Sequence, residues 1–253
     1  MLPAELPERR LHVLLAEDNA VNQRLAASLL ERRGHKVTIA TNGREALDAV
    51  RQKHFDVVLM DVQMPEMGGF EATAAIRALE RENGSHVAII AMTAHAMKGD
   101  RERCLAAGMD EYLTKPLDPR RLCVLVEQMA PDGAPGIDDI EGAAQGLPPQ
   151  VLARVGGDRQ LLAEISRLFV DDAPRHLEGI RRALDGHDGE SLRRAAHGLK
   201  GSAANFDAEA LVTAARALEE IGRTSQFEDH EAAWRALTRE TDRLISILRT
   251  VTV

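Results

Sequence analysis

The chain has 253 residues, of which 44% are hydrophobic and 28% charged, so it is not a wholly disordered protein. Its formal net charge of −8 and its 3% aromatic content argue against direct nucleic-acid binding, which needs a basic surface or stacking rings. No run approaches the roughly 20 apolar residues of a membrane span, and the N-terminus lacks the pattern of a secretory signal.

The first half of the chain alternates short apolar runs, rich in β-branched residues, with segments of helical pattern. The runs, in chain order, are LHVLLA, KVTIA, DVVLM, VAIIA and EYLTK. This alternation predicts repeated βα units that form a doubly wound, five-stranded parallel sheet with helices on both faces. We assign residues 11–129 to this α/β domain and residues 1–10 to an N-terminal extension.

A stretch without helical or strand periodicity follows the fifth run. Residues 130–150 read APDGAPGIDDIEGAAQGLPPQ, with four prolines and four glycines. Such composition is typical of a linker, which we place at residues 130–148.

Residues 149–253 contain amphipathic helical patterns and no strand-like run, which predicts an all-α helical bundle. A short helix is expected after Pro149. Four longer helices are expected at 158–184, at 188–204, from an N-cap at Asp207 to near Gly222, and at 227–250.

Polar side chains stand where four of the predicted strands end. Glu17 and Asp18 follow the first strand, Asp61 the third, Thr93 the fourth and Lys115 the fifth. The carboxyl ends of parallel strands meet at one edge of a sheet, so these groups are expected to converge. Three adjacent carboxylates repel one another, and a divalent cation such as Mg²⁺ relieves the repulsion. A carboxylate nucleophile beside a metal, a hydroxyl and an ammonium predicts phosphoryl transfer.

Each of these residues has a simpler structural reading when taken alone. Asp18 or Asn19 would serve as the cap of a helix that starts near Val21. Lys115 alone would be an ordinary solvated charge. The ordered arrangement, with polar groups after four of the five strands, is what favours a functional site.

The helical half contains one histidine in a distinctive setting. Projected at 100° per residue, Leu192, Leu199 and Phe206 share a core face, and His197 lies opposite them and is predicted to point to solvent. The other residues on its face are Arg193, Arg194, Lys200 and Gly201. A neutral imidazole is a nucleophile near pH 7, and the basic neighbours favour a phosphoryl group. The alternative is a solvated histidine on a basic helical face.

Residues 11–129 resemble a two-component receiver domain of the flavodoxin-like fold. The matching segments are LLAEDNAVNQ, LMDVQMPEMGGFEAT, AMTAHAM and MDEYLTKPL, although Gly68 replaces an acidic residue that many relatives carry. The resemblance implies Asp61 as the phospho-acceptor, and Glu17, Asp18, Asp61 and the backbone carbonyl of Gln63 as Mg²⁺ ligands. It further implies that Thr93 and Lys115 hold the phosphoryl group, that Tyr112 is an aromatic switch, and that the Lys115–Pro116 bond is cis.

Residues 148–250 resemble a histidine phosphotransfer (HPt) domain through HGLKGSAANF, which carries the H-x-x-K-G-S signature. The resemblance implies a four-helix bundle with His197 exposed on the second long helix and phosphorylated at a ring nitrogen. Lys200, Gly201, Arg193 and Arg194 would bind the phosphoryl group or the docking partner. Phe206 and Asp207 depart from the residues often found there.

Together the two resemblances imply a bacterial phosphorelay protein. Phosphoryl would pass from a sensor histidine kinase to Asp61, then to His197, then to a downstream response regulator. The protein would be cytoplasmic, either free or tethered to the inner membrane through an upstream region or a partner kinase.

Three alternatives remain at this point. No ATP-binding motif is visible, since PDGAPG reads as linker, so kinase activity would require that the chain be the C-terminal fragment of a hybrid histidine kinase. A protein interaction module without phosphorylation is the second alternative. A DNA-binding regulator would need a basic recognition helix, whereas the most basic segment carries His197.

Overall fold

The computed structural model describes residues 10–93, 100–129, 149–228 and 230–251. The predicted linker at 130–148 lies outside the described residues, as does His95 of the AMTAHAM segment. The chain divides into two compact units, Met1–Glu141 and Gly142–Val253, which are described separately.

The first unit contains a five-stranded sheet in the order β2-β1-β3-β4-β5, with every neighbouring pair parallel. The strands are β1 (His12–Ala16), β2 (Lys36–Ala40), β3 (Val57–Asp61), β4 (Ala88–Thr93) and β5 (Glu111–Thr114). The central strand β3 is buried along its whole length, which explains its continuous apolar run. The edge strand β2 is partly exposed, and it accordingly carries Lys36 and Thr38.

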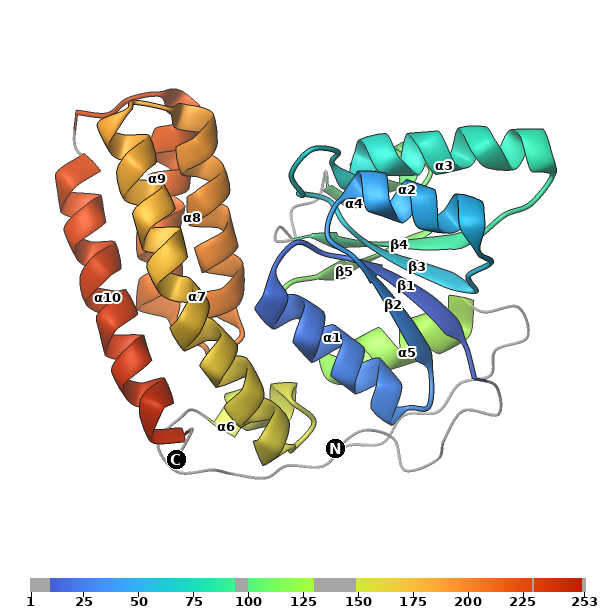
Figure 1. Cartoon of the computed structure of the whole chain (residues 1–253), viewed down its shortest axis with the longest axis horizontal. Helices are drawn as coiled ribbons and strands as arrows, with labels where there is room; N and C mark the ends of the chain where they lie inside the picture. Colours follow the sequence, from blue (N-terminus) through green and yellow to red (C-terminus); the bar gives the residue numbers. More distant parts are fainter. Residues whose placement is uncertain (1–9, 94–99, 130–148, 229, 252–253) are drawn as a thin grey trace. The chain divides into compact units, whose positions relative to one another are not determined.

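Helices cover both faces of the sheet (Figure 1). One face carries α1 (Ala20–Arg32) and α5 (Pro119–Met129), and the other carries α2 (Gly43–Gln52), α3 (Gly69–Asn83) and α4 (Asp100–Ala106). Leu14, Val58 and Met60 of the sheet pack in one core with Leu47 of α2 and Ile76 of α3. The predicted doubly wound α/β fold is confirmed.

The backbone at Gly69 passes so close to Asp61 that only glycine fits. A Cβ atom at Gly69 would lie 2.2 Å from the carbonyl oxygen of Asp61, whereas one at Gly68 would lie 3.5 Å from the nearest atom, the carbonyl oxygen of Val62. We expect Gly69→Ala to lower the free energy of unfolding by more than about 2 kcal/mol, because backbone must move. Gly68→Ala, the matched control, should cost less than about 1 kcal/mol. Urea denaturation of both variants tests this, and equal losses would contradict it.

The second unit is a bundle of helices, as predicted. They are α6 (Pro149–Arg154), α7 (Arg159–Asp185), α8 (Gly189–Ala204), α9 (Glu209–Thr224) and α10 (His230–Val251). Helices α7 to α10 form a four-helix bundle in which α8 packs on α7 and α9, and α10 packs on the same two helices (Figure 1). Phe169 and Phe206 meet edge to face in its core, with ring centroids 5.4 Å apart. None of the described helices is both long and apolar enough to cross a membrane.

The prediction that Asp207 caps the third long helix is wrong. Ala208 occupies the cap position of α9 and makes no side-chain cap hydrogen bond. Asp207 takes a positive φ of 52° and forms an ion pair with Arg154 of α6. Arg154 also donates to the carbonyl oxygen of Ala204 at the end of α8. The guanidinium thereby binds both a carboxylate and a helix C-terminus, where positive charge is favourable.

Candidate functional sites

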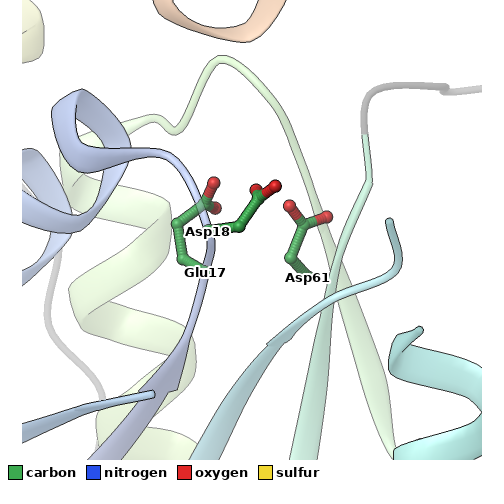
Figure 2. A group of neighbouring side chains, drawn as sticks. All are labelled: Glu17, Asp18 and Asp61. Atoms are coloured by element: carbon green, nitrogen blue, oxygen red, sulfur yellow. The ribbon is translucent and has the colours of Figure 1, made fainter. Parts of the chain in front are cut away.

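The first candidate site lies where β1 and β3 end. These strands are hydrogen-bonded neighbours, and Ala16 pairs with Met60, so the residues that follow are brought side by side. Ligand oxygens of Glu17, Asp18 and Asp61 all lie within 4.8 Å of one another (Figure 2). Glu17 and Asp61 are buried and Asp18 is exposed, so the cluster opens to solvent on one side.

Lys115 supplies the positive charge of this cluster. Its Nζ lies 2.6 Å from Glu17 Oε2 and 2.6 Å from Asp61 Oδ2. The backbone N–H of Lys115 donates to the carbonyl oxygen of Thr93, with N and O 2.7 Å apart, which joins the ends of β4 and β5. All five side chains that were predicted to converge therefore come from one edge of the sheet.

The carboxyl groups of the cluster are not fully balanced by the one ammonium of Lys115. Burial, with the negative charge of Asp61 beside it, raises the pKa of Glu17 to about 7 despite the nearby ammonium of Lys115. Burial works against ionisation of Lys115, but Asp61 and Glu17 outweigh it and raise the Lys115 pKa. One ammonium thus faces three carboxyl groups. Hard carboxylate oxygens with excess negative charge are a donor set suited to a divalent cation such as Mg²⁺.

Helix α1 holds Glu17 in place through residues that the sequence analysis did not single out. Asn22 Nδ2 donates to Glu17 Oε1 at 3.0 Å, and Gln23 Nε2 donates to the Glu17 carbonyl oxygen at 2.6 Å. Asn19 caps α1 by accepting from the backbone N–H of Asn22. Of the two cap alternatives, Asn19 is the cap, and Asp18 belongs to the carboxylate cluster. Amide side chains in the first turn after an acidic pair were the signal available in the sequence.

The remaining residues predicted for this site are Gln63, Thr93 and Tyr112. The backbone N–H of Gln63 donates to Asp61 Oδ1 at 3.1 Å. Thr93 is buried at the end of β4. Tyr112, on β5, is half-buried, and the guanidinium carbon of Arg121 lies 5.6 Å from its ring centroid. The Lys115–Pro116 peptide bond is cis, as predicted.

The second candidate site surrounds His197 on α8. The core face is as predicted, with Leu192, Leu199 and Phe206 all buried. His197 is less exposed than predicted, because only 16% of its side chain is exposed and its Nδ1 lies 2.6 Å from Oε1 of Glu219. The projection considered α8 alone, whereas α9 packs along this helix and brings Glu219 within hydrogen-bond distance of the imidazole.

Glu219 also binds the neighbouring lysine. Lys200 is buried, and its Nζ donates to Glu219 Oε2 at 2.6 Å. Burial opposes ionisation of Glu219, but the hydrogen bonds from His197 and Lys200 outweigh it and lower the pKa of Glu219. Glu219 is thus an ionised carboxylate with a basic group on each oxygen, and the sequence analysis did not identify it.

The other residues predicted on this face are divided between solvent and packing contacts. Arg193 and Arg194 are 32% and 54% exposed and pair with Glu190 on the same helix. A Cβ atom at Gly198 would lie 2.7 Å from the imidazole of His176, so this glycine makes room for a side chain of α7. The carbonyl oxygen of Gly201 accepts from the side chain of Asn205.

Two protein families match this chain in succession. Residues 13–127 match the response regulator receiver domain. Residues 164–247 match the Hpt domain.

Similar proteins include sensor histidine kinases of bacteria. The sensor histidine kinase GacS of Pseudomonas protegens is 35% identical over 212 residues, which are 78% of this chain and 23% of that protein. The signal transduction histidine-protein kinase BarA of Escherichia coli is 32% identical over 199 residues, 75% of this chain and 22% of that protein. The chain spans less than a quarter of the length of these relatives.

Solved structures that are similar to this chain match about half of its length. The receiver domain of a Pseudomonas aeruginosa sensor histidine kinase, solved with a magnesium ion in its active-site cleft, is 40% identical, with a TM-score of 0.44. The match covers 48% of this chain and 98% of that one. A chain from the Saccharomyces cerevisiae complex of Ypd1 with the receiver domain of Ssk1 is 30% identical, with a TM-score of 0.48, covering 50% and 91%.

Proposed function

Because this chain belongs to the proteins that join a receiver domain to an Hpt domain, we propose that it carries phosphoryl groups in a phosphorelay, first on Asp61 and then on His197. The observation that carries the proposal is the convergence of Glu17, Asp18, Asp61 and Lys115 at one edge of the sheet. A lone turn aspartate or helix cap would not bring three carboxyl groups and a buried ammonium together.

We assign Mg²⁺ to the carboxylates of Glu17, Asp18 and Asp61 and to the backbone carbonyl of Gln63. Bound there, it would neutralise negative charge on the oxygens of an incoming phosphoryl group. The deficit of positive charge around Glu17 supports this assignment.

The residues of the receiver domain have separate roles in the first phosphoryl transfer. An oxygen of Asp61 attacks the phosphorus of a phospho-histidine, and the electrons of the broken P–N bond return to the donor ring. Lys115 and the hydroxyl of Thr93 hold two phosphoryl oxygens. Tyr112 changes position with Thr93 as the switch of the receiver.

In the second transfer, a ring nitrogen of His197 attacks the phosphorus on Asp61, and the electrons of the broken P–O bond return to the carboxylate. Arg193 and Arg194 add positive charge to the face that docks the partner, while Lys200 and Gly201 border the imidazole. The partners are a sensor histidine kinase as donor and the receiver domain of a downstream response regulator as acceptor. Since the relatives are longer histidine kinases, the donor kinase and this chain would also fit within one longer protein.

Removal of the metal provides a direct test. When the whole chain is incubated with a radiolabelled acyl phosphate and Mg²⁺, we expect label in a hydroxylamine-sensitive linkage, as a carboxyl phosphate requires. Chelation of Mg²⁺ should reduce the labelling rate at least roughly a hundredfold, because several kcal/mol of charge stabilisation are lost. Replacing Mg²⁺ with Na⁺ at equal ionic strength is the control for salt effects. No labelling with Mg²⁺ would favour the interaction module instead.

A further inference from the structure

The two oxygens of the Glu17 carboxylate have different surroundings. Oε1 accepts two hydrogen bonds from the start of α1, one from Asn22 Nδ2 at 3.0 Å and one from the backbone N–H of Asn19 at 3.3 Å. Oε2 lies 2.6 Å from the ammonium nitrogen of Lys115, within the carboxylate cluster. Glu17, Asn19 and Asn22 are all buried, so the protein itself holds the carboxylate in this orientation.

The two donors leave only one oxygen of Glu17 for a cation. An ionised carboxylate has about two lone-pair sites on each oxygen. The N–H groups of Asn22 and Asn19 occupy both sites on Oε1. Oε2 is therefore the oxygen that remains for a metal ion, or for a water molecule bound to that ion. Glu17 could offer both oxygens to one ion only if a donor released Oε1.

Mg²⁺ and Ca²⁺ differ in the carboxylate geometry that suits them. Mg²⁺ is small, requires a nearly ideal octahedron and keeps several of its water molecules. Ca²⁺ is larger, takes about 6–8 oxygen ligands and often binds both oxygens of one carboxylate. A carboxylate that is restricted to one oxygen therefore favours Mg²⁺ over Ca²⁺.

We propose that Asn22 determines the cation specificity of the receiver site, because its amide holds Oε1 and restricts Glu17 to a single oxygen. This inference rests on the Mg²⁺ site of the proposed function and deepens it. Asn22 acts through the carboxylate of Glu17, so it is a positioning residue. Its backbone N–H bonds the cap residue Asn19, and that bond is independent of the Asn22 side chain.

The test measures binding of Mg²⁺ and Ca²⁺, each added alone as its chloride, to the whole unphosphorylated chain. NMR titration of backbone amide signals of the receiver unit gives both dissociation constants. Asn22→Leu keeps the branching of the side chain but has no donor, so Mg²⁺ affinity should fall roughly tenfold, as when other groups that orient a metal ligand are lost. Ca²⁺ affinity should fall less than about threefold, because the released Oε1 becomes available to the larger ion. The ratio of the two dissociation constants should therefore shift at least roughly threefold towards Ca²⁺.

Gln23→Leu is the matched control, since Gln23 donates to the backbone carbonyl oxygen of Glu17 and leaves the bonds to the carboxylate in place. It should change both affinities by the same factor. Asn22→Ala also lacks the donor, should shift the ratio in the same direction, and carries the test if circular dichroism shows that Asn22→Leu does not fold.

The proposal is overturned if the folded Asn22 variants keep the parent ratio, or if Gln23→Leu shifts the ratio as much as they do. If the parent chain binds neither cation, the Mg²⁺ assignment of the proposed function fails, and this inference fails with it. An unchanged ratio in a parent chain that does bind Mg²⁺ would leave the assignment standing and reject only the role of Asn22.

Discussion

Asp61→Asn should reduce labelling of the receiver unit to background, a loss of at least roughly a thousandfold in rate. The amide of asparagine is not a nucleophile comparable to a carboxylate and forms no acyl phosphate. The substitution preserves the shape of the side chain, and Lys115 keeps Glu17 as an ion-pair partner. Phosphorylation by an acyl phosphate and by a phosphorylated histidine kinase should both be lost, as measured by incorporation of labelled phosphate.

The matched control for this variant is Asp48→Asn. Asp48 lies on α2, is about half exposed, and pairs only across one helical turn with Arg51 among the contacts described for it. The Asp48→Asn variant should be labelled on Asp61 at the same rate as the parent chain. Thermal unfolding followed by circular dichroism should show that both variants remain folded. Normal labelling of Asp61→Asn would show that another residue accepts the phosphoryl group first.

His197→Gln should leave labelling of Asp61 intact and abolish transfer to a downstream receiver domain. Glutamine can still donate an N–H to Glu219, so the local pairing is retained, but it has no ring nitrogen to form the P–N bond. The expected loss in onward transfer is again at least roughly a thousandfold. The measurement follows labelled phosphate from the chain to a purified acceptor receiver domain.

His176→Gln is the control on the same bundle. His176 lies on α7, pairs with Asp172 and packs against Gly198, next to His197 in sequence. The His176→Gln variant should pass phosphoryl groups to the acceptor receiver domain at the same rate as the parent chain. If His176→Gln blocked onward transfer while His197→Gln did not, the phosphoryl acceptor would be His176 on α7 and the assignment to His197 on α8 would be wrong. If His197→Gln also prevented labelling of Asp61, the order of transfer would be reversed.

The carboxylate cluster could be predicted because the pairing of parallel strands brings the residues that follow them to the same edge of the sheet. Once the apolar runs are taken as parallel strands, the residues after each run must share an edge, whatever the details of packing. Glu17, Asp61 and Lys115 follow this rule, and their side chains meet. Asn22 and Gln23 could not be selected in the same way, since their contacts with Glu17 depend on the direction in which α1 leaves the strand.

By itself, the sequence determined the strand and helix pattern, the edge that gathers the acidic residues, and the core face of the helix that carries His197. These features arise from local periodicity and chain order. The tertiary structure alone decided that His197 is hydrogen-bonded to the carboxylate of Glu219, which lies on another helix, 22 residues further along the chain. It also decided that Asp207 pairs with Arg154 and does not cap α9. Contacts between helices depend on their relative rotation and approach, which a pattern read along one helix does not contain.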